Sequence, residues 1–119
     1  VEIHGANGYL PDQFLRDGSN VRKDRYGGSI ANRARFALEV TEAVTSVWGP
    51  ERVGYRISPL NPYNSMKDSN PRETFGFLVR ELSAMKLGYL HMVESADTRA
   101  ADRLAPSFRE LFRGALIIN

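Results

Sequence analysis

The sequence predicts an α/β fold in which parallel strands alternate with helices. Four short apolar runs have the length and composition of strands, and the segments between them show the apolar spacing of helices. The expected strands are Val1–His4, Val53–Ser58, Tyr89–Glu94 and Ala115–Ile118. The resulting β-α-β-α-β-α-β order is typical of parallel strands joined by right-handed helical crossovers.

The first helix is expected from Ile30 to Trp48. Ser29 precedes it as an N-cap, and Gly49 with the following proline ends it. Apolar side chains recur on this segment at spacings of three and four residues, which indicates one buried face. That face is expected to contain Phe36, Val40, Val44 and Val47.

Two further helices are expected after the second strand. Asn70, Pro71 and Glu73 form a capping-box arrangement with proline at the first helical position. The buried face of this second helix is expected to contain Phe75, Leu78, Leu82 and Met85, and Gly88 ends it. A shorter third helix is expected from about Pro106 to Arg113.

The segment Pro11–Gly28 is polar and rich in turn residues, so we expect an ordered loop that covers the strand ends. Residues 24–26 (D-R-Y) are expected to hold this loop in place. Arg33 and Arg35, on the first helix, are expected to face solvent or to form surface salt bridges.

The polarity of the strands indicates how the sheet is arranged. In the run V-G-Y-R-I-S, Val53, Tyr55 and Ile57 share one face, whereas Gly54, Arg56 and Ser58 share the other. A central strand of an open doubly wound sheet is apolar on both faces. Polar groups towards the carboxyl ends are instead typical of the mouth of a closed (β/α)8 TIM barrel, the end that carries the active site. Four strands would form only part of such a barrel.

Arg56 is expected to point into this mouth beside His4. A buried guanidinium needs an anionic or strongly accepting partner, because an unpaired one costs several kcal/mol. The partner is either a bound ligand or a carboxylate of the chain, Glu2 or Glu94. From the residues alone, both possibilities remain open.

The opening run V-E-I-H-G-A-N-G-Y-L places polar groups directly after the first strand. Gly5 and Gly8 permit tight turning, so His4, Asn7 and Tyr9 can converge above the carboxyl end of the strand. Two hydrogen-bond donors and a phenol gathered there would suit a carbonyl group or an anion. The alternative is a core histidine followed by an ordinary turn, and ten residues alone do not decide between them.

Composition excludes several classes of function. The chain of 119 residues has the size of one small domain, with 42% apolar residues and a net charge of +2. Its charges are interspersed, so we expect no nucleic-acid partner, and no apolar run approaches the roughly 18 residues of a membrane span. The chain has no cysteine and two histidines, which argues against a metal site. We expect a cytoplasmic protein.

Two longer motifs occur in a fixed order along the chain. The first comprises H-G-A-N-G-Y-L, then D-Q-F-L and R-K-D-R-Y-G-G-S-I-A-N-R-A-R-F, and the second comprises V-G-Y-R-I-S-P with N-S-M after it. Together they resemble the Old Yellow Enzyme family of flavin-dependent ene-reductases. The resemblance covers nearly the whole chain and is weakest from Ala96 to Arg113. It implies a (β/α)8 barrel with FMN at its mouth, of which this chain resembles about strands four to seven.

The resemblance also implies roles for individual residues. His4 and Asn7 resemble the pair that binds the carbonyl oxygen of the substrate or a phenolate, and Tyr9 resembles the proton donor. Arg56, together with His4, is expected to contact FMN, with the arginine at the N1 and C2 carbonyl edge of the flavin. The implied reaction transfers a hydride from NADPH or NADH to flavin N5 and then to the β-carbon of an enone. Enones, phenols and nitro compounds are the expected small-molecule partners.

The limits of the chain suggest that it is incomplete. It begins within a strand without a methionine and ends on a strand at Asn119, so residues 1–119 are expected to be one central-to-late segment of an FMN-binding barrel rather than a complete domain. The phosphate-binding ends of the last two strands would then lie outside it. The alternative function is an inactive half-barrel held by self-association or by a complementary chain. A flavin-free barrel enzyme would have to carry these motifs by accident.

Overall fold

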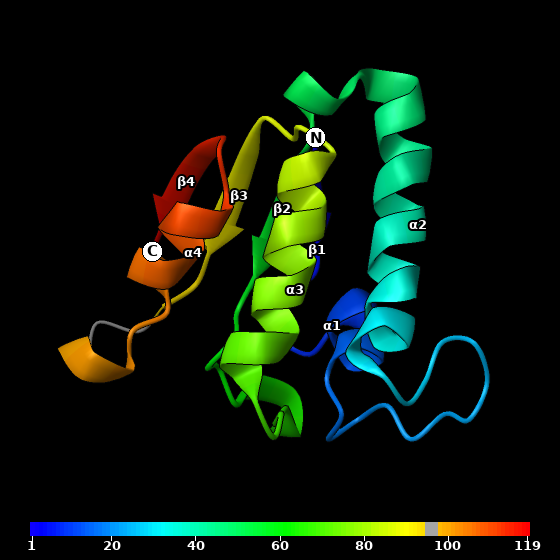
Figure 1. Cartoon of the computed structure of the whole chain (residues 1–119), viewed down its shortest axis with the longest axis vertical. Coiled ribbons are helices and arrows are strands. Elements are labelled where there is room, and N and C mark those ends of the chain that lie inside the picture. Colours follow the sequence, from blue (N-terminus) through cyan, green and yellow to red (C-terminus); the bar gives the residue numbers. More distant parts are fainter. Residues whose placement is uncertain (95–97) are drawn as a thin grey trace.

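Four parallel strands and the helices between them make up the fold (Figure 1). The computed structural model describes residues 1–94 and 98–119. The strands are β1 (Glu2–His4), β2 (Gly54–Ile57), β3 (Tyr89–Met92) and β4 (Ala115–Ile118), and the helices are α1 (Leu10–Leu15), α2 (Ile30–Trp48), α3 (Pro71–Ala84) and α4 (Ala105–Leu111). Short 3-10 turns span Pro50–Arg52, Tyr63–Ser65 and Ala100–Asp102. None of the helices described is both long and apolar enough to cross a membrane.

The strand order favours a barrel over an open doubly wound sheet. The strands lie in the order β1-β2-β3-β4, and every pair is parallel. Helices α2, α3 and α4 lie on the same side of the sheet (Figure 1). A doubly wound sheet reverses its strand order at a switch point and carries helices on both faces, whereas a (β/α)8 barrel keeps chain order with the helices outside.

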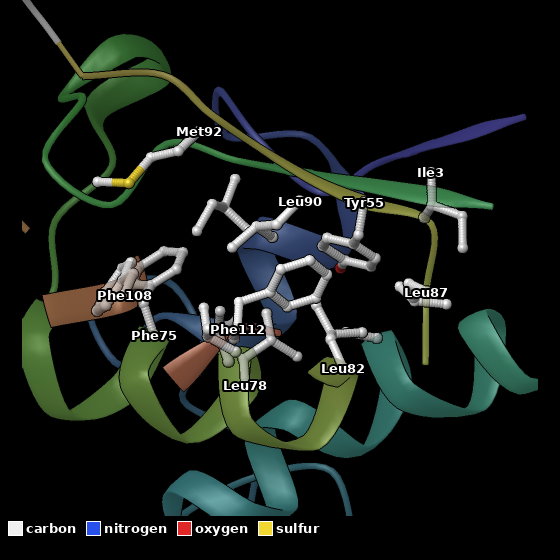
Figure 2. Packing of buried hydrophobic residues seen from close by; sticks show 14 of the residues in the cluster. Ile3, Tyr55, Phe75, Leu78, Leu82, Leu87, Leu90, Met92, Phe108 and Phe112 are labelled. Atoms are coloured by element: carbon white, nitrogen blue, oxygen red, sulfur yellow. The ribbon is translucent and has the colours of Figure 1, made fainter. Parts of the chain in front are cut away.

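The hydrophobic core lies between the sheet and the helices. Figure 2 shows Ile3, Tyr55, Leu90 and Met92 on the strands pointing towards Phe75, Leu78 and Leu82 on α3, with Phe108 and Phe112 beside them. All nine side chains are buried. The alternate residues of the same strands face away from the helices, because successive side chains of a strand point to opposite faces. The opposite face therefore carries the polar residues of β1, β2 and β3.

The predicted elements are largely confirmed. Strands β2 and β3 end one and two residues earlier than expected, and β1 and β2 begin one residue later. Helix α2 has the predicted bounds, and Ser29 Oγ accepts a hydrogen bond from the backbone N–H of Asn32. Asn70 caps α3, since its Oδ1 accepts from Glu73 N–H and its Nδ2 donates to the Glu73 carboxylate. These caps form between residues three positions apart, which explains why local sequence was enough to predict them.

The prediction of a loop throughout Pro11–Gly28 is wrong, because α1 occupies Leu10–Leu15. This short helix depends on tertiary contacts. Arg33 Nε donates to Leu15 O at 2.8 Å, so a side chain from α2 satisfies a carbonyl group at the end of α1. Residues 24–26 do hold the remaining loop: Asp24 Oδ1 accepts from Tyr26 N–H, and the Tyr26 hydroxyl donates to Glu39 on α2.

The buried face of α2 also differs from the prediction. Its fully buried residues are Arg33, Ala34, Ala37 and Thr41. Val40 and Val44 pack only partly against the core, and Val47 is 78% exposed. Phe36 instead stacks on Phe14 of α1, with ring centroids 4.3 Å apart. Three of these four buried positions carry small side chains, and α2 lies against both α1 and α3, which apolar spacing alone did not indicate.

Arg33 is not part of a solvated face. It is 7% exposed and donates to Leu15 O, to Gly28 O at 2.5 Å and to Thr74 Oγ1 at 3.3 Å. Its guanidinium therefore joins α1, the loop before α2, and α3. Multiple hydrogen bonds of this kind are what a buried cation requires.

Asp17 links the end of α1 to the loop before α3, and this link is expected to depend on pH. The Ser69 hydroxyl donates to Asp17 Oδ2, and Ser69 N–H donates to Oδ1 at 3.0 Å. These bonds, the hydroxyl foremost, lower the pKa of Asp17. A carboxylate with a lowered pKa in the folded state stabilises the protein above its unfolded pKa of about 3.9, and this contribution is lost as the pH falls through the folded pKa.

We therefore expect Ser69→Ala to lower the free energy of unfolding at pH 7. Below about pH 4 the difference in this free energy between the two proteins should become smaller as the pH falls. Denaturant unfolding of both proteins at pH 7 and pH 3 measures the difference. A destabilisation of equal size at both pH values would contradict a role of the Asp17 charge.

Candidate active site

The carboxyl ends of the first three strands bring three polar side chains into one row. In the strand register, His4 lies opposite Arg56, and Arg56 lies opposite His91. All three lie on the face of the sheet that is turned away from the helices, because Ile3, Tyr55, Leu90 and Met92 point into the core. The predicted neighbourhood of His4 and Arg56 is confirmed.

A tight turn follows β1 and returns Tyr9 to His4. The backbone N–H of Tyr9 donates to Ala6 O at 3.2 Å, and Gly8 has a φ of +74°. The rings of His4 and Tyr9 have centroids 5.0 Å apart and are tilted by 45°. Both side chains are exposed, and Tyr9 is 51% exposed. They can therefore meet a ligand that lies over the carboxyl end of β1.

Gly5 is required by the close approach of the tyrosine on β2. A Cβ atom at Gly5 would lie 2.2 Å from the ring of Tyr55 and 2.4 Å from its hydroxyl oxygen. Tyr55 is 1% exposed, and burial raises the pKa of its hydroxyl, with a smaller contribution from the charge of Asp12. This phenol therefore stays neutral beneath the turn, whereas Tyr9 lies above it.

Three side chains from the segment after β2 hold Asn7. The backbone N–H of Asn7 donates to Ser58 Oγ at 2.7 Å, and Asn64 Nδ2 donates to Asn7 O at 2.8 Å. Asn61 Nδ2 donates to Asn7 Oδ1 at 2.9 Å. Asn7 Nδ2 makes no hydrogen bond to residues 1–94 or 98–119, so it can donate to a ligand. Asn7 adopts a φ of +56°, a conformation that asparagine tolerates better than most residues.

A buried ion pair anchors the turn from below. Asp12 Oδ2 accepts from Gly8 N–H at 2.9 Å, and Asp12 Oδ1 accepts from Arg16 Nε at 2.8 Å. Arg16 Nη2 also donates to Ser58 O at 2.5 Å, at the end of β2. Asp12 is 0% exposed and Arg16 is 2% exposed. Sequence analysis missed this pair, although the spacing of four residues between opposite charges was a usable signal.

Arg56 has no carboxylate partner among the described residues. Glu2 binds His91, with 3.0 Å between Oε2 and Nδ1, and Glu94 Oε1 accepts from the backbone N–H of Leu104 at 2.7 Å, at the start of α4. Of the two alternatives that the sequence left open, the pairing of Arg56 with Glu2 or Glu94 is therefore not the one found among the described residues. Arg56 Nε is buried and has no hydrogen-bond partner in residues 1–94 and 98–119. A buried donor of this kind calls for an acceptor from a ligand or from further chain.

His91 extends the polar row towards β4. Besides its contact with Glu2, its Nε2 lies 3.1 Å from Asn119 Oδ1. Tyr89 lies on the same face of β3, and its hydroxyl has a raised pKa because of burial and, to a smaller extent, the charge of Glu2. These contacts occupy Glu2. Arg56 therefore faces the mouth without a carboxylate bonded to it in the described part of the chain.

Comparisons with known proteins agree with this geometry. Residues 1–111 match the family model of the NADH:flavin oxidoreductase / NADH oxidase family. The chain is 50% identical over 98 residues to a flavin oxidoreductase of Emericella nidulans, covering 79% of this chain and 25% of that protein. It is 45% identical over 119 residues to a probable flavin mononucleotide-dependent alkene reductase of Leishmania infantum, covering 98% of this chain and 32% of that protein.

Solved structures show the same fold. Morphinone reductase in complex with tetrahydroNAD superposes with a TM-score of 0.92 at 45% identity, covering 99% of this chain and 32% of that one. The old yellow enzyme homologue from Zymomonas mobilis superposes with a TM-score of 0.93 at 38% identity, covering 100% of this chain and 35% of that one. The chain thus spans between a quarter and two fifths of the length of these relatives. It belongs to the NADH:flavin oxidoreductase / NADH oxidase family and, within it, to the Old Yellow Enzymes, as part of their (β/α)8 barrel.

Proposed function

We propose that this chain forms the substrate-facing part of an FMN-dependent ene-reductase, which reduces the activated C=C bond of α,β-unsaturated carbonyl compounds with NADPH or NADH. The observation that carries the proposal is the buried, unpartnered Nε of Arg56 in register with His4. The family match and the alkene reductase among the relatives support the same reaction class. The expected ligands of the mouth are enones, phenols and nitro compounds.

The residues of the mouth fit FMN. Arg56 offers a buried N–H donor and a positive charge, which suit the N1 and C2 carbonyl edge of a flavin, where reduction places negative charge. A fixed cation in a partly desolvated site stabilises that charge more than a hydrated one does. His4 lies beside Arg56 in the strand register and is expected to contact the same ligand from β1. When bound, FMN would supply the hydride that reduces the alkene.

His4 and Asn7 are proposed to bind the carbonyl oxygen of the substrate. The free Nδ2 of Asn7 and a ring N–H of His4, at the end of β1, are hydrogen-bond donors three positions apart, and His4 is exposed. Negative charge develops on the carbonyl oxygen when a hydride reaches the β-carbon, so donors fixed in advance lower the barrier by about 3 kcal/mol each. Tyr9 is proposed to deliver the proton that the α-carbon then needs.

A second candidate is a half-barrel without activity, held by association with itself or with a complementary chain. The exposed edge strands favour it. Strands β1 and β4 each pair on one side only, and Ile117 and Ile118 on β4 are 45% and 51% exposed. Unpaired edges with apolar side chains readily pair with another strand.

FMN binding and enone reduction by the complete protein test the proposal. We expect the complete protein to purify with FMN and to oxidise NADPH or NADH in step with 2-cyclohexenone, whereas the 119-residue chain alone should bind FMN weakly. Arg56→Met should weaken FMN binding by about tenfold or more, since it removes a charge-assisted hydrogen bond.

Arg52→Met is the matched control for Arg56→Met. Arg52 lies just before β2, and its side chain is 74% exposed beside Glu51. The Arg52→Met variant should therefore bind FMN as well as the unaltered protein does. Equal FMN affinity in both variants would remove Arg56 from the flavin site. A protein that binds FMN but reduces no enone would contradict the ene-reductase assignment, and a chain that self-associates without FMN in every preparation would favour the half-barrel.

A further inference from the structure

The side-chain amide of Asn7 works as a donor only if its nitrogen, and not its oxygen, is presented to the ligand. This inference rests on the proposed function, in which Asn7 binds a substrate oxygen. In the structure, Asn61 Nδ2 donates to Asn7 Oδ1 at 2.9 Å. That bond occupies the oxygen of Asn7 and leaves both N–H groups of its Nδ2 available, since no residue described accepts from them.

A backbone group sets the direction of this contact. Asn61 Oδ1 accepts a hydrogen bond from the backbone N–H of Tyr63 at 3.0 Å. A backbone N–H can only donate, so Asn61 must turn its oxygen to Tyr63 and its nitrogen to Asn7. Asn7 must then turn its own oxygen to Asn61. The order of donors and acceptors is thereby fixed from Tyr63 to the free Nδ2 of Asn7.

The main chain of Asn7 is held separately from its side chain. Ser58 Oγ accepts from the backbone N–H of Asn7, and Asn64 Nδ2 donates to the backbone carbonyl. Fixing the backbone, at a φ of +56°, does not fix the amide, because a half-turn about χ2 exchanges its oxygen and nitrogen. Asn61 is the described side chain that bonds to this amide.

We propose that Asn61 is a positioning residue that fixes the amide of Asn7 with its nitrogen towards the substrate oxygen. Asn61 lies 54 positions from Asn7 in the chain, on the loop after β2. It does not itself need to touch the substrate. Without its N–H donor, the amide of Asn7 can reverse and present an acceptor to the carbonyl or phenolate oxygen, which repels it.

Phenol binding to the complete, FMN-loaded protein, measured by calorimetry, tests this role. Asn61→Asp keeps an acceptor for Tyr63 N–H but has no N–H for Asn7, so it favours the reversed amide. We expect the Kd for phenol to rise about 10-fold to 100-fold, the loss of one charge-assisted hydrogen bond. Asn61→Ala, which leaves the amide free to turn, should raise Kd less, by about threefold, as a neutral hydrogen bond would.

Asn64→Asp is the matched control, because it adds the same charge to the same loop and removes only a bond to the main chain of Asn7. Asn61→Asp should weaken phenol binding clearly more than Asn64→Asp.

Three results would overturn the inference. Phenol affinity of Asn61→Asp equal to that of Asn64→Asp would refute it, and so would unchanged affinity in Asn61→Ala. The third is an unaltered protein that binds FMN but neither phenol nor an enone. That result refutes the proposed function itself and the role of Asn61 with it. Measurements on the unaltered protein alone identify it, so it is distinguished from a failure of the Asn61 inference. The melting temperature and flavin absorbance of each variant show that it is folded and loaded.

Discussion

Replacing Tyr9 with phenylalanine should slow enone reduction by about 10²-fold to 10⁴-fold, the usual contribution of a general acid. The change removes one oxygen atom from a side chain that is 51% exposed, so we expect no effect on folding. The hydroxyl that is lost lies on the turn beside His4, whose ring centroid is 5.0 Å from that of Tyr9. Protonation of the α-carbon then depends on water.

Stopped-flow measurements separate the two half-reactions. Reduction of the flavin by NADPH should be nearly unaffected in Tyr9→Phe, and reoxidation by 2-cyclohexenone should carry the loss. Phenol binding should also be retained, in contrast to Asn7→Ala, which removes a donor to the phenol oxygen. Tyr63→Phe is the matched control, because Tyr63 is 58% exposed on the loop after β2 and contributes its backbone N–H to Asn61. Equal losses in both half-reactions would remove Tyr9 as the proton donor.

Replacing Asp12 with alanine should destabilise the protein by about 3–5 kcal/mol, the cost of leaving a buried charge without its partner. Arg16 is 2% exposed and would keep only the carbonyl oxygen of Ser58 among its bonded acceptors. Gly8 N–H would also lose its acceptor at the turn that carries Tyr9. Stability and the geometry of the site therefore depend on the same carboxylate.

Denaturant unfolding of the complete protein measures this effect. Asp102→Ala is the control, because the Arg99–Asp102 pair is exposed, with side chains 83% and 49% accessible, and should cost no more than about 1 kcal/mol. Replacing Asp12 and Arg16 together by leucine and methionine should recover much of the lost stability, since no charge then stays buried. A single Asp12→Ala variant as stable as Asp102→Ala would show that the pair contributes little.

Local sequence was sufficient for elements whose determinants lie within a few residues. Ser29 and Asn70 cap their helices through bonds to residues three positions ahead, and the turn after β1 depends on glycines inside it. The convergence of His4 and Tyr9 was predictable for the same reason, because only four residues of turn separate them. The buried face of α2 was not predictable in this way, since Phe36 stacks on Phe14 in α1, a helix that the sequence analysis did not predict.

Partners of charged and amide side chains required the tertiary structure. Arg33 was predicted on a solvated or salt-bridging face, but it is buried where α2 meets α1 and α3. Glu2 binds His91, and Glu94 binds the start of α4, so neither carboxylate binds Arg56. The contact between Asn61 and Asn7 spans 54 positions and has no sequence signature. Such contacts are invisible to periodicity, which reports only which residues share a face of one element.

The sequence by itself determined the order of the strands and of α2, α3 and α4, the caps of α2 and α3, and the set of polar residues at the carboxyl ends of β1 and β2. Each depends on hydrogen bonds and side-chain spacing within about ten residues, where chain geometry leaves few choices. Only the tertiary structure decided that Arg56 Nε lacks a partner among the described residues, that Asp12 and Arg16 anchor the turn, and that Asn61 faces Asn7. Those outcomes depend on which groups are removed from water together, and burial is set by the packing of distant elements.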